Sequence, residues 1–264
     1  MFILVIIAFS LACQKAQRDE DTSVNTCEDI FLAQTVFSDA YKQIRIAAFN
    51  AQGISQSDST AGTIYGCEDI DVDTLSNPKT ITINYKFIGC EGLGAVRNGR
   101  LIGSFIGKFP KSGSAVDISF SNYFFNGFEV DGKIRVIFKD NNAAGQEVHT
   151  FYLQQGSIYD GKTTMTWTAS QNWTIDVSGK NETYTVNGNS NGINRKGNTF
   201  KSEITKAYEM SEECLYVLSG SEEIKVTNLS TRNLDYGSGT CDEAATAEIN
   251  GATYGVKLPS GSDL

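Results

Sequence analysis

The sequence has a single histidine, three prolines and no long apolar segment after its first residues. The lone histidine, His149, restricts any Ser-His-Asp or Cys-His site to one position, and no G-x-S-x-G motif accompanies it. No CxxC or Cys/His spacing typical of structural zinc is present. We therefore expect no cofactor, and we interpret His149 as a structural residue of a strand.

Basic residues are also few, since 22 Lys and Arg stand against 31 Asp and Glu and leave a formal charge of −9. An acidic chain repels phosphate backbones, which argues against nucleic-acid partners.

One apolar run opens the chain. Residues 2–12 are almost wholly apolar and uncharged, the length of a signal-peptide core but too short to span a bilayer. Ser10-Leu11-Ala12-Cys13 resembles a lipobox, which predicts cleavage before Cys13 and lipidation of its thiol. Ser10 stands where leucine is preferred, and no basic residue precedes the run. The alternative is an ordinary signal peptide before an unmodified cysteine.

The predicted mature chain contains five further cysteines, which suit an oxidising compartment. Cys67 with Cys90, and Cys214 with Cys241, bracket strand-like runs and are candidate disulfides. Each would close a loop of roughly 25 residues and contribute about 3 kcal/mol. Cys27 is left unpaired, although sequence alone leaves the connectivity open.

A polar stretch and a helical pattern follow the predicted anchor. Residues 13–26 read as a flexible tether. Apolar residues then recur at helical spacing over about residues 27–50, which predicts one amphipathic helix with a single apolar stripe. Residues 27–264 are expected to form a single β-rich domain that includes this helix.

The remainder of the domain alternates apolar and polar residues. Segments such as Ile81–Phe87, Lys133–Phe138, Thr163–Ala169 and Leu215–Leu218 show period two and predict about a dozen half-buried strands. No strand is predicted between residues 227 and 244. We interpret six dipeptides as hairpin turns, which makes the sheet an antiparallel meander: Asn98-Gly99, Asn126-Gly127, Asp131-Gly132, Asp160-Gly161, Asn187-Gly188 and Asn250-Gly251. So many strands favour a strongly curved sheet or partly open barrel, with the helix filling its hollow or covering an edge.

Two acidic or amide-rich segments are weak metal candidates. Asp69, Asp71 and Asp73 would share one face of a strand, where aligned carboxylates could bind calcium. Apolar Ile70 and Val72 between them favour a strand with its acids in solvent. The segment 187–198 has glycine at the sixth position of a calcium loop but ends in Asn198, so we interpret it as a long hairpin loop.

Aromatic and threonine-rich segments permit two surface hypotheses. Trp167, Trp173, Tyr159 and the cluster 123–125 could form a sugar-stacking platform. Alternation places Met165 and Trp167 on one face of a strand, which favours the core instead. Thr164, Thr166 and Thr168 occupy the other face and could order water, although threonine is common on exposed strands.

Several segments together resemble a family of Bacteroidota cell-envelope lipoproteins to which no reaction or ligand is assigned. They are the lipobox, the helix, ITINYKFIGC, residues 98–136 and the C-terminal GSGTCDEAATAEINGATYGVKL. The resemblance implies a lipid-anchored protein of the outer membrane, facing the periplasm or the cell surface. It transfers no functional residue. In such lipoproteins, an acidic cluster like Asp19-Glu20-Asp21 resembles a surface-export signal.

Three functions remain open. The leading one is non-enzymatic: a structural role, or binding of a glycan, a lipid or an envelope protein through the curved sheet. The second is glycan hydrolysis by an acid pair that the sequence does not reveal. The third is lipid or lipoprotein carriage in an open barrel.

Overall fold

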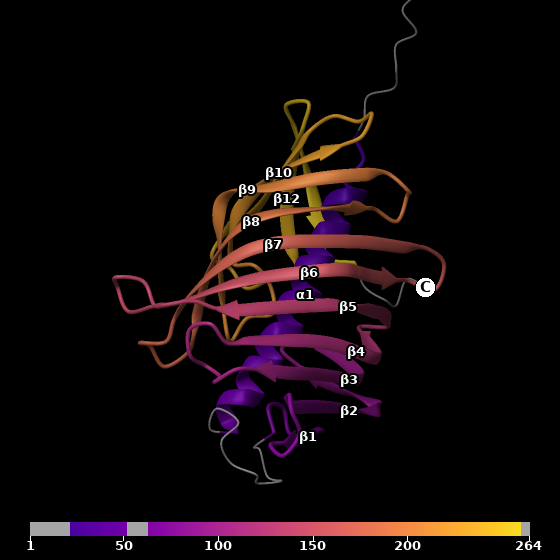
Figure 1. The fold of residues 1–264 in the computed structure, drawn as a ribbon. Coiled ribbons are helices and arrows are strands. Elements are labelled where there is room, and N and C mark those ends of the chain that lie inside the picture. The colour runs from indigo at the N-terminus through magenta and orange to yellow at the C-terminus, as the bar shows by residue number, and fades with distance from the viewer. Residues whose placement is uncertain (1–21, 52–62, 260–264) are drawn as a thin grey trace, which may run out of the picture.

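The computed structural model describes residues 22–51 and 63–259, so the predicted signal peptide and Cys13 lie outside the described residues. Within that part of the chain, one helix is followed by thirteen strands (Figure 1). The elements are α1 (Asn25–Asn50), β1 (Glu68–Asp73), β2 (Lys79–Gly92), β3 (Ala95–Ile106), β4 (Ala115–Phe125), β5 (Phe128–Phe138), β6 (Glu147–Tyr159), β7 (Thr164–Asp176), β8 (Thr183–Ile193), β9 (Thr199–Ser211), β10 (Ser219–Val226), β11 (Arg232–Ser238), β12 (Ala244–Ile249) and β13 (Ala252–Lys257).

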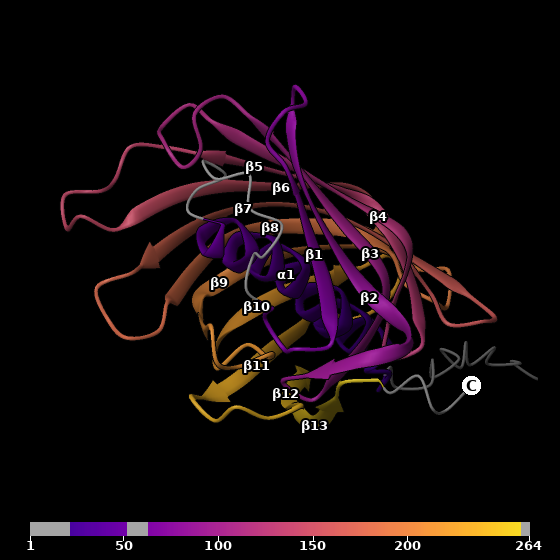
Figure 2. The same cartoon turned by 90° about the horizontal axis from the view of Figure 1, so that it is seen from below.

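The strands form one antiparallel sheet in sequence order, from β1 at one edge to β13 at the other. The sheet is not closed, because β1 and β13 do not pair with each other. Figure 2 shows it curling around α1, which occupies the hollow. The predicted mainly β fold, a curved antiparallel meander with one N-terminal helix, is confirmed.

The helix α1 is more deeply buried than the predicted single apolar stripe requires. It begins at Asn25, and 21 of its 26 residues are buried. Buried apolar side chains meet the inner face of the sheet; Phe37, for example, stacks on Trp167 with ring centroids 5.7 Å apart. Its polar side is enclosed as well, because the sheet wraps around the helix, so the stripe was only part of the buried surface.

Alternation along the strands separates an inner from an outer face, as predicted for β7. Met165 and Trp167 point inward and are buried, whereas Thr164, Thr166 and Thr168 are exposed. The same period of two places apolar side chains against α1 along most of the sheet.

Only three of the six predicted hairpin turns are turns. Asn126-Gly127, Asp160-Gly161 and Asn250-Gly251 connect consecutive strands. The other three dipeptides, Asn98-Gly99, Asp131-Gly132 and Asn187-Gly188, lie inside β3, β5 and β8, where the strand register shifts. The prediction was wrong there because a β-bulge, like a tight turn, recruits glycine at positive φ.

The bulge at Gly99 shows why glycine is needed. Gly99 has φ +81°, and a Cβ at this position would lie 1.8 Å from the backbone oxygen of Asn122 in β4. Bulges increase the local bend and twist of a strand. They allow strands of 11 to 14 residues to follow the curvature around α1.

The C-terminal part of the sheet brought further corrections. The predicted strand over residues 215–218 is not a strand, and β11 was not predicted. The segment 187–198 is not a long loop, because β8 continues to Ile193 and a short turn reaches β9. Both predicted disulfides are confirmed, and Cys27 is a free, buried thiol.

Candidate functional site

A polar network between α1 and the inner face of the sheet contains the only histidine. His149 of β6 is 1 % exposed. Its Nδ1 is hydrogen-bonded to the Tyr41 hydroxyl of α1. Its Nε2 lies 3.2 Å from Glu147 Oε2, two residues earlier in the same strand. The period of two in β6 turns both Glu147 and His149 toward the helix.

Arg45 of α1 extends this network to a second carboxylate. Its Nη1 lies 2.8 Å from Glu147 Oε2. Its Nε and Nη2 donate to the two oxygens of Glu182, just before β8, at 2.7 and 2.8 Å. Tyr184 also donates to Glu182 at 2.9 Å. Arg45 is itself buried, so its guanidinium holds two acids from different parts of the sheet.

The order carboxylate, imidazole and hydroxyl in Glu147, His149 and Tyr41 is that of a nucleophilic triad. Tyr41 is only 1 % exposed, and burial raises the pKa of its phenol. Its ring is flanked by Phe151 and Trp173, with centroids 6.2 and 5.2 Å away. A substrate would have to displace these core side chains to reach the hydroxyl. The arrangement therefore joins helix to sheet, in agreement with the structural interpretation of His149.

Glu147 and Glu182 do not have the properties of a glycosidase acid pair. Burial acts to raise the pKa of Glu147, but the hydrogen bond from His149 and the charge of Arg45 outweigh it and lower the pKa to about 2. A general acid needs a raised pKa. Glu222 of β10 has one, because burial raises its pKa, but it is 2 % exposed and accepts a hydrogen bond from Tyr236 at 3.0 Å.

The hollow that a lipid carrier would need is occupied. Side chains from the N-terminal half of α1 contact the inner face: the ring of Phe31 lies 5.2 Å from that of Tyr236, and Gln34 accepts a hydrogen bond of 2.6 Å from Gln171. An acyl chain would enter this space only if the helix moved out.

The predicted sugar-stacking platform is not assembled. Trp167 and Trp173 are 2 % and 0 % exposed, and Tyr123 is fully buried. They belong to the core around α1, as the alternation in β7 already favoured. Tyr159 alone of the named rings is largely exposed, at 39 %.

The three aspartates of β1 lie as a strand predicts. Asp69 and Asp71 are exposed and Asp73 is half-buried. Asp69 lies 3.8 Å from the ammonium of Lys86, and Asp73 accepts backbone hydrogen bonds from the turn that follows. In the described part of the chain, these carboxylates do not form a group of three donor side chains close enough to hold one metal ion. This supports the interpretation of a strand with its acids in solvent.

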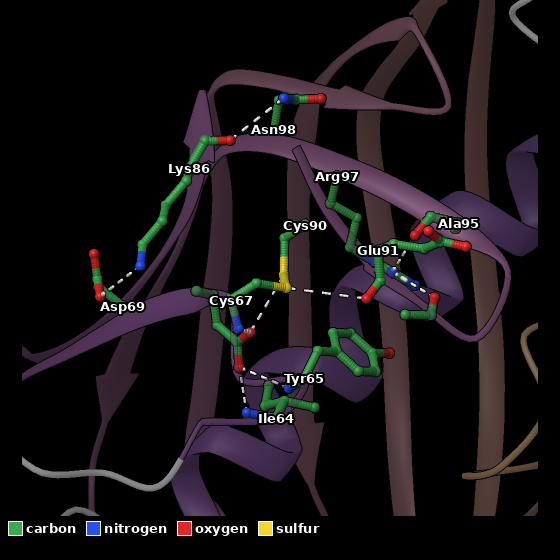
Figure 3. The surroundings of a disulfide bond; sticks show 12 residues. Ile64, Tyr65, Cys67, Asp69, Lys86, Cys90, Glu91, Ala95, Arg97 and Asn98 are labelled. Carbon is green, nitrogen blue, oxygen red and sulfur yellow. Dashed lines mark hydrogen bonds and ion pairs between the residues drawn. A yellow bond between two sulfur atoms is a disulfide. The ribbon is translucent and has the colours of Figure 1, made fainter. Parts of the chain in front are cut away.

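Another set of donor atoms, which the sequence interpretation missed, lies at the Cys67–Cys90 disulfide (Figure 3). Sulfur and carboxylate atoms of Cys67, Glu68 and Cys90 all lie within 4.8 Å of one another. Among residues 22–51 and 63–259, this is the one group of three or more potential metal-ligating side chains with that spacing. The sequence shows only that Glu68 follows Cys67. The contact of Glu68 with Cys90 depends on the pairing of β1 with β2, which the sequence does not reveal.

Two hollows on the outer face of the sheet are lined by several charged and hydrogen-bonding side chains. One, of about 370 Å³, lies over β3 to β6 and is lined by Ser104, Asp117, Ile118, Ser119, Lys133, Ile134, Arg135 and Gln154. The other, of about 470 Å³, lies over β8 to β10 and is lined by Asn189, Ser190, Asn191, Lys201, Ser202, Glu203, Glu223 and Lys225. Hydroxyl, amide and charged groups of both signs are present in each.

Strand register places the two hollows on one line across the sheet. Arg135 of the first hollow is directly opposite Tyr152, which is opposite Ser170. Ser170 is in turn opposite Asn189 of the second hollow. Tyr152 is 37 % exposed and therefore stands between the two hollows on the outer face.

Comparison with known proteins adds no functional residue, because no family model, curated protein or solved structure matches this chain. None of the helical residues in the described part of the chain provides a segment long and apolar enough to cross a membrane.

Proposed function

We propose that this protein is a lipid-anchored protein of the outer membrane, facing the periplasm or cell surface, that binds a glycan on the outer face of its sheet without catalysis. The observation that carries the proposal is the line of polar groups joining the two outer hollows through Tyr152.

The chemistry of this line suits a long, hydroxyl-rich ligand. Adjacent strands are about 4.8 Å apart, so the four steps from Arg135 in β5 to Glu203 in β9 span about 19 Å. An aromatic ring between the two hollows offers apolar contact to a sugar face, while the amide and charged groups that line them offer hydrogen bonds to hydroxyls. The track is therefore long enough for several sugar units.

The charge arrangement in the larger hollow supports a ligand there. Lys201 lies opposite Lys225, and Glu203 lies opposite Glu223, across β9 and β10. Like charges directly opposite each other are unfavourable in a sheet. Lys225 already pairs with Glu223 of the same strand, with Nζ 2.5 Å from Oε1. Lys201 and Glu203 are therefore the charges on which a ligand would act, with hydroxyl groups that accept from the lysine and donate to the glutamate.

The proposed anchor rests on the apolar residues 2–12 and on Cys13. The two disulfides support an oxidising compartment such as the envelope. Replacing Cys13 by alanine is expected to move the protein from the membrane fraction to the soluble fraction and to abolish incorporation of labelled fatty acid. Unchanged membrane fractionation of Cys13→Ala, with no label in the wild type, would reject the anchor.

Binding is tested with soluble polysaccharides in affinity electrophoresis, using two exposed tyrosines of one strand. Tyr152→Ala is expected to weaken binding about tenfold, because a ring contact contributes up to about 1.5 kcal/mol. Tyr159 is the matched control: it is 39 % exposed in β6, but it lies opposite Glu129 and Thr164 and so away from the line that joins the hollows. The proposal fails if the wild type binds no glycan in a broad panel, or if both variants lose binding equally.

A further inference from the structure

The Cys67–Cys90 disulfide links the start of β1 to the end of β2, and this corner has a feature that disulfide bonding does not require. Glu68, the first residue of β1, is 2 % exposed, yet its carboxylate lies beside the disulfide. Its Oε2 is 3.3 Å from Sγ of Cys90, which is fully buried. Cys67 is partly exposed, so the pair has one accessible and one enclosed sulfur.

The turn before β1 holds this carboxylate in place (Figure 3). Glu68 Oε1 accepts hydrogen bonds from the backbone N–H groups of Tyr65, at 2.9 Å, and Ile64. Its Oε2 accepts from the N–H of Cys67 at 3.2 Å. Such outer contacts orient a ligand before a metal arrives.

We propose that reduction of the Cys67–Cys90 disulfide converts this corner into a zinc site, with Cys67, Glu68 and Cys90 as ligands. Two thiolates and a carboxylate are ligands that Zn²⁺ accepts, and a fourth position would remain for water beside the partly exposed Cys67. The proposal is independent of glycan binding.

The geometry of the corner matches the metal. Zinc–sulfur bonds of about 2.3 Å at a tetrahedral angle separate two sulfurs by about 3.8 Å. The three donor atoms already lie within 4.8 Å of one another, and the Cα atoms of the two cysteines are 5.4 Å apart. Rotation of the cysteine side chains is enough to open the sulfur–sulfur separation. Six residue pairs between β1 and β2 keep the backbone in place.

The reduction step needs a dithiol reductant. One thiolate of the reductant bonds to the accessible Cys67 sulfur, the disulfide breaks, and Cys90 leaves as a thiolate that takes a proton from water. The second thiolate of the reductant then displaces Cys67 and closes the reductant's own disulfide. Two electrons have passed to the cysteine pair. Zinc binding then releases the two thiol protons to solvent.

The chain contains its own control. Cys214 and Cys241 form a second disulfide, but no third ligating side chain joins them in the described part of the chain. A zinc site that needs Glu68 should therefore form at one disulfide and not at the other.

The test is a Zn²⁺ titration of purified protein, oxidised and reduced, against a competing chelator. Co²⁺ serves as a probe, because thiolate ligation produces charge-transfer absorption. We expect one Zn²⁺ per reduced chain and none per oxidised chain. Glu68→Gln should weaken binding to the reduced protein at least tenfold. The double variant Cys214→Ser/Cys241→Ser should bind as the wild type does, and Cys67→Ser/Cys90→Ser should not bind.

Circular dichroism of each reduced sample monitors the fold. The proposal is overturned if the reduced, folded protein binds no stoichiometric Zn²⁺, or if Glu68→Gln binds as tightly as the wild type. It is also overturned if reduction unfolds the chain, because the site depends on the carboxylate held by the turn before β1.

Discussion

On the inner face of the sheet, ion pairs join α1 to parts of the sheet far away in the sequence, whereas on the outer face they join residues of the same strand or of neighbouring strands. Asp39 of α1 and Arg97 of β3 pair through two hydrogen bonds of 2.8 Å, and both side chains are fully buried. Asp117 of β4 and Arg135 of β5 are 3.5 Å apart, with about half of each side chain exposed. The first pair is closed to solvent, and the second is open to water or a ligand.

This difference shows how the helix is positioned. Its polar residues contact separate parts of the sheet. Asp29 pairs with Arg195, which follows β8, and Lys42 donates to the backbone oxygens of Ser211 and Cys214. Arg45 pairs with Glu147 at the start of β6 and with Glu182 just before β8. Buried ionic groups are costly unless they are fully paired. A helix shifted by one turn would break several pairs together, so these contacts select one position of α1 in the hollow.

The largest predicted difference between the faces concerns these two aspartates. Asp39→Asn leaves the Arg97 guanidinium buried without its counter-ion and should lower the free energy of unfolding by about 3–5 kcal/mol. Asp117→Asn removes an exposed partner and should cost about 0–1 kcal/mol. Urea denaturation measures both. Equal losses would mean that the inner pair has no special role.

The second prediction concerns the bends that let the inner face wrap around α1. Gly99 and Gly251 both have φ +81°, but only Gly99 has backbone atoms in the space of a Cβ. Gly251→Ala should cost about 1 kcal/mol through backbone strain alone. Gly99→Ala should cost about 1–3 kcal/mol more, because the strands must separate. Thermal denaturation of both variants tests the difference; similar melting temperatures would contradict it.

The smallest predicted effect is the pH dependence of the inner network. Burial lowers the pKa of His149, so the stability that its neutral form contributes is complete above about pH 6.5 and is lost as the pH falls toward the folded-state value. The pKa of Glu147 is lowered from 4.5 to about 2, so its contribution is complete above pH 4.5 and disappears toward pH 2. The melting temperature should therefore fall on acidification.

Glu147→Gln isolates the carboxylate in this experiment. The variant is expected to be less stable at neutral pH and to show a flatter decline between pH 4.5 and 2, because the group that takes up the proton on unfolding is gone. Parallel curves for the variant and the wild type would show that Glu147 does not contribute to the acid sensitivity.

Local patterns predicted features that depend on near neighbours in the chain. Alternation in β7 correctly assigned Trp167 to the core and Thr166 to solvent, and cysteines flanking strand-like runs predicted both disulfides. The same patterns failed where one local signal has two structural uses. Asn98-Gly99 predicted a hairpin turn, but the positive φ of Gly99 serves a bulge, and only the partner strand distinguishes the two.

The strand β11 was missed for a related reason. The first inward-facing residue of β11 is Arg232, which is fully buried. The outward-facing residues Asn233, Asp235 and Gly237 are of types that rarely occur in strands. A buried arginine breaks the apolar alternation that identifies a strand. Its burial makes sense only beside the start of α1, where its guanidinium donates to the backbone oxygen of Ser23.

The sequence alone was sufficient for the class of fold, because the period of two, the helical stripe and the turn residues are properties of neighbouring residues. It was not sufficient for the inner network, the zinc-ligating corner or the outer track. Glu147 contacts Arg45, and Glu68 contacts Cys90. Tyr152 lies between the two hollows. All three arrangements depend on the pairing of the strands in sequence order and on the curling of the sheet around one helix. Glu68 and Cys90 are 22 positions apart and Arg45 and Glu147 are 147 − 45 = 102 apart, and no local pattern encodes such separations.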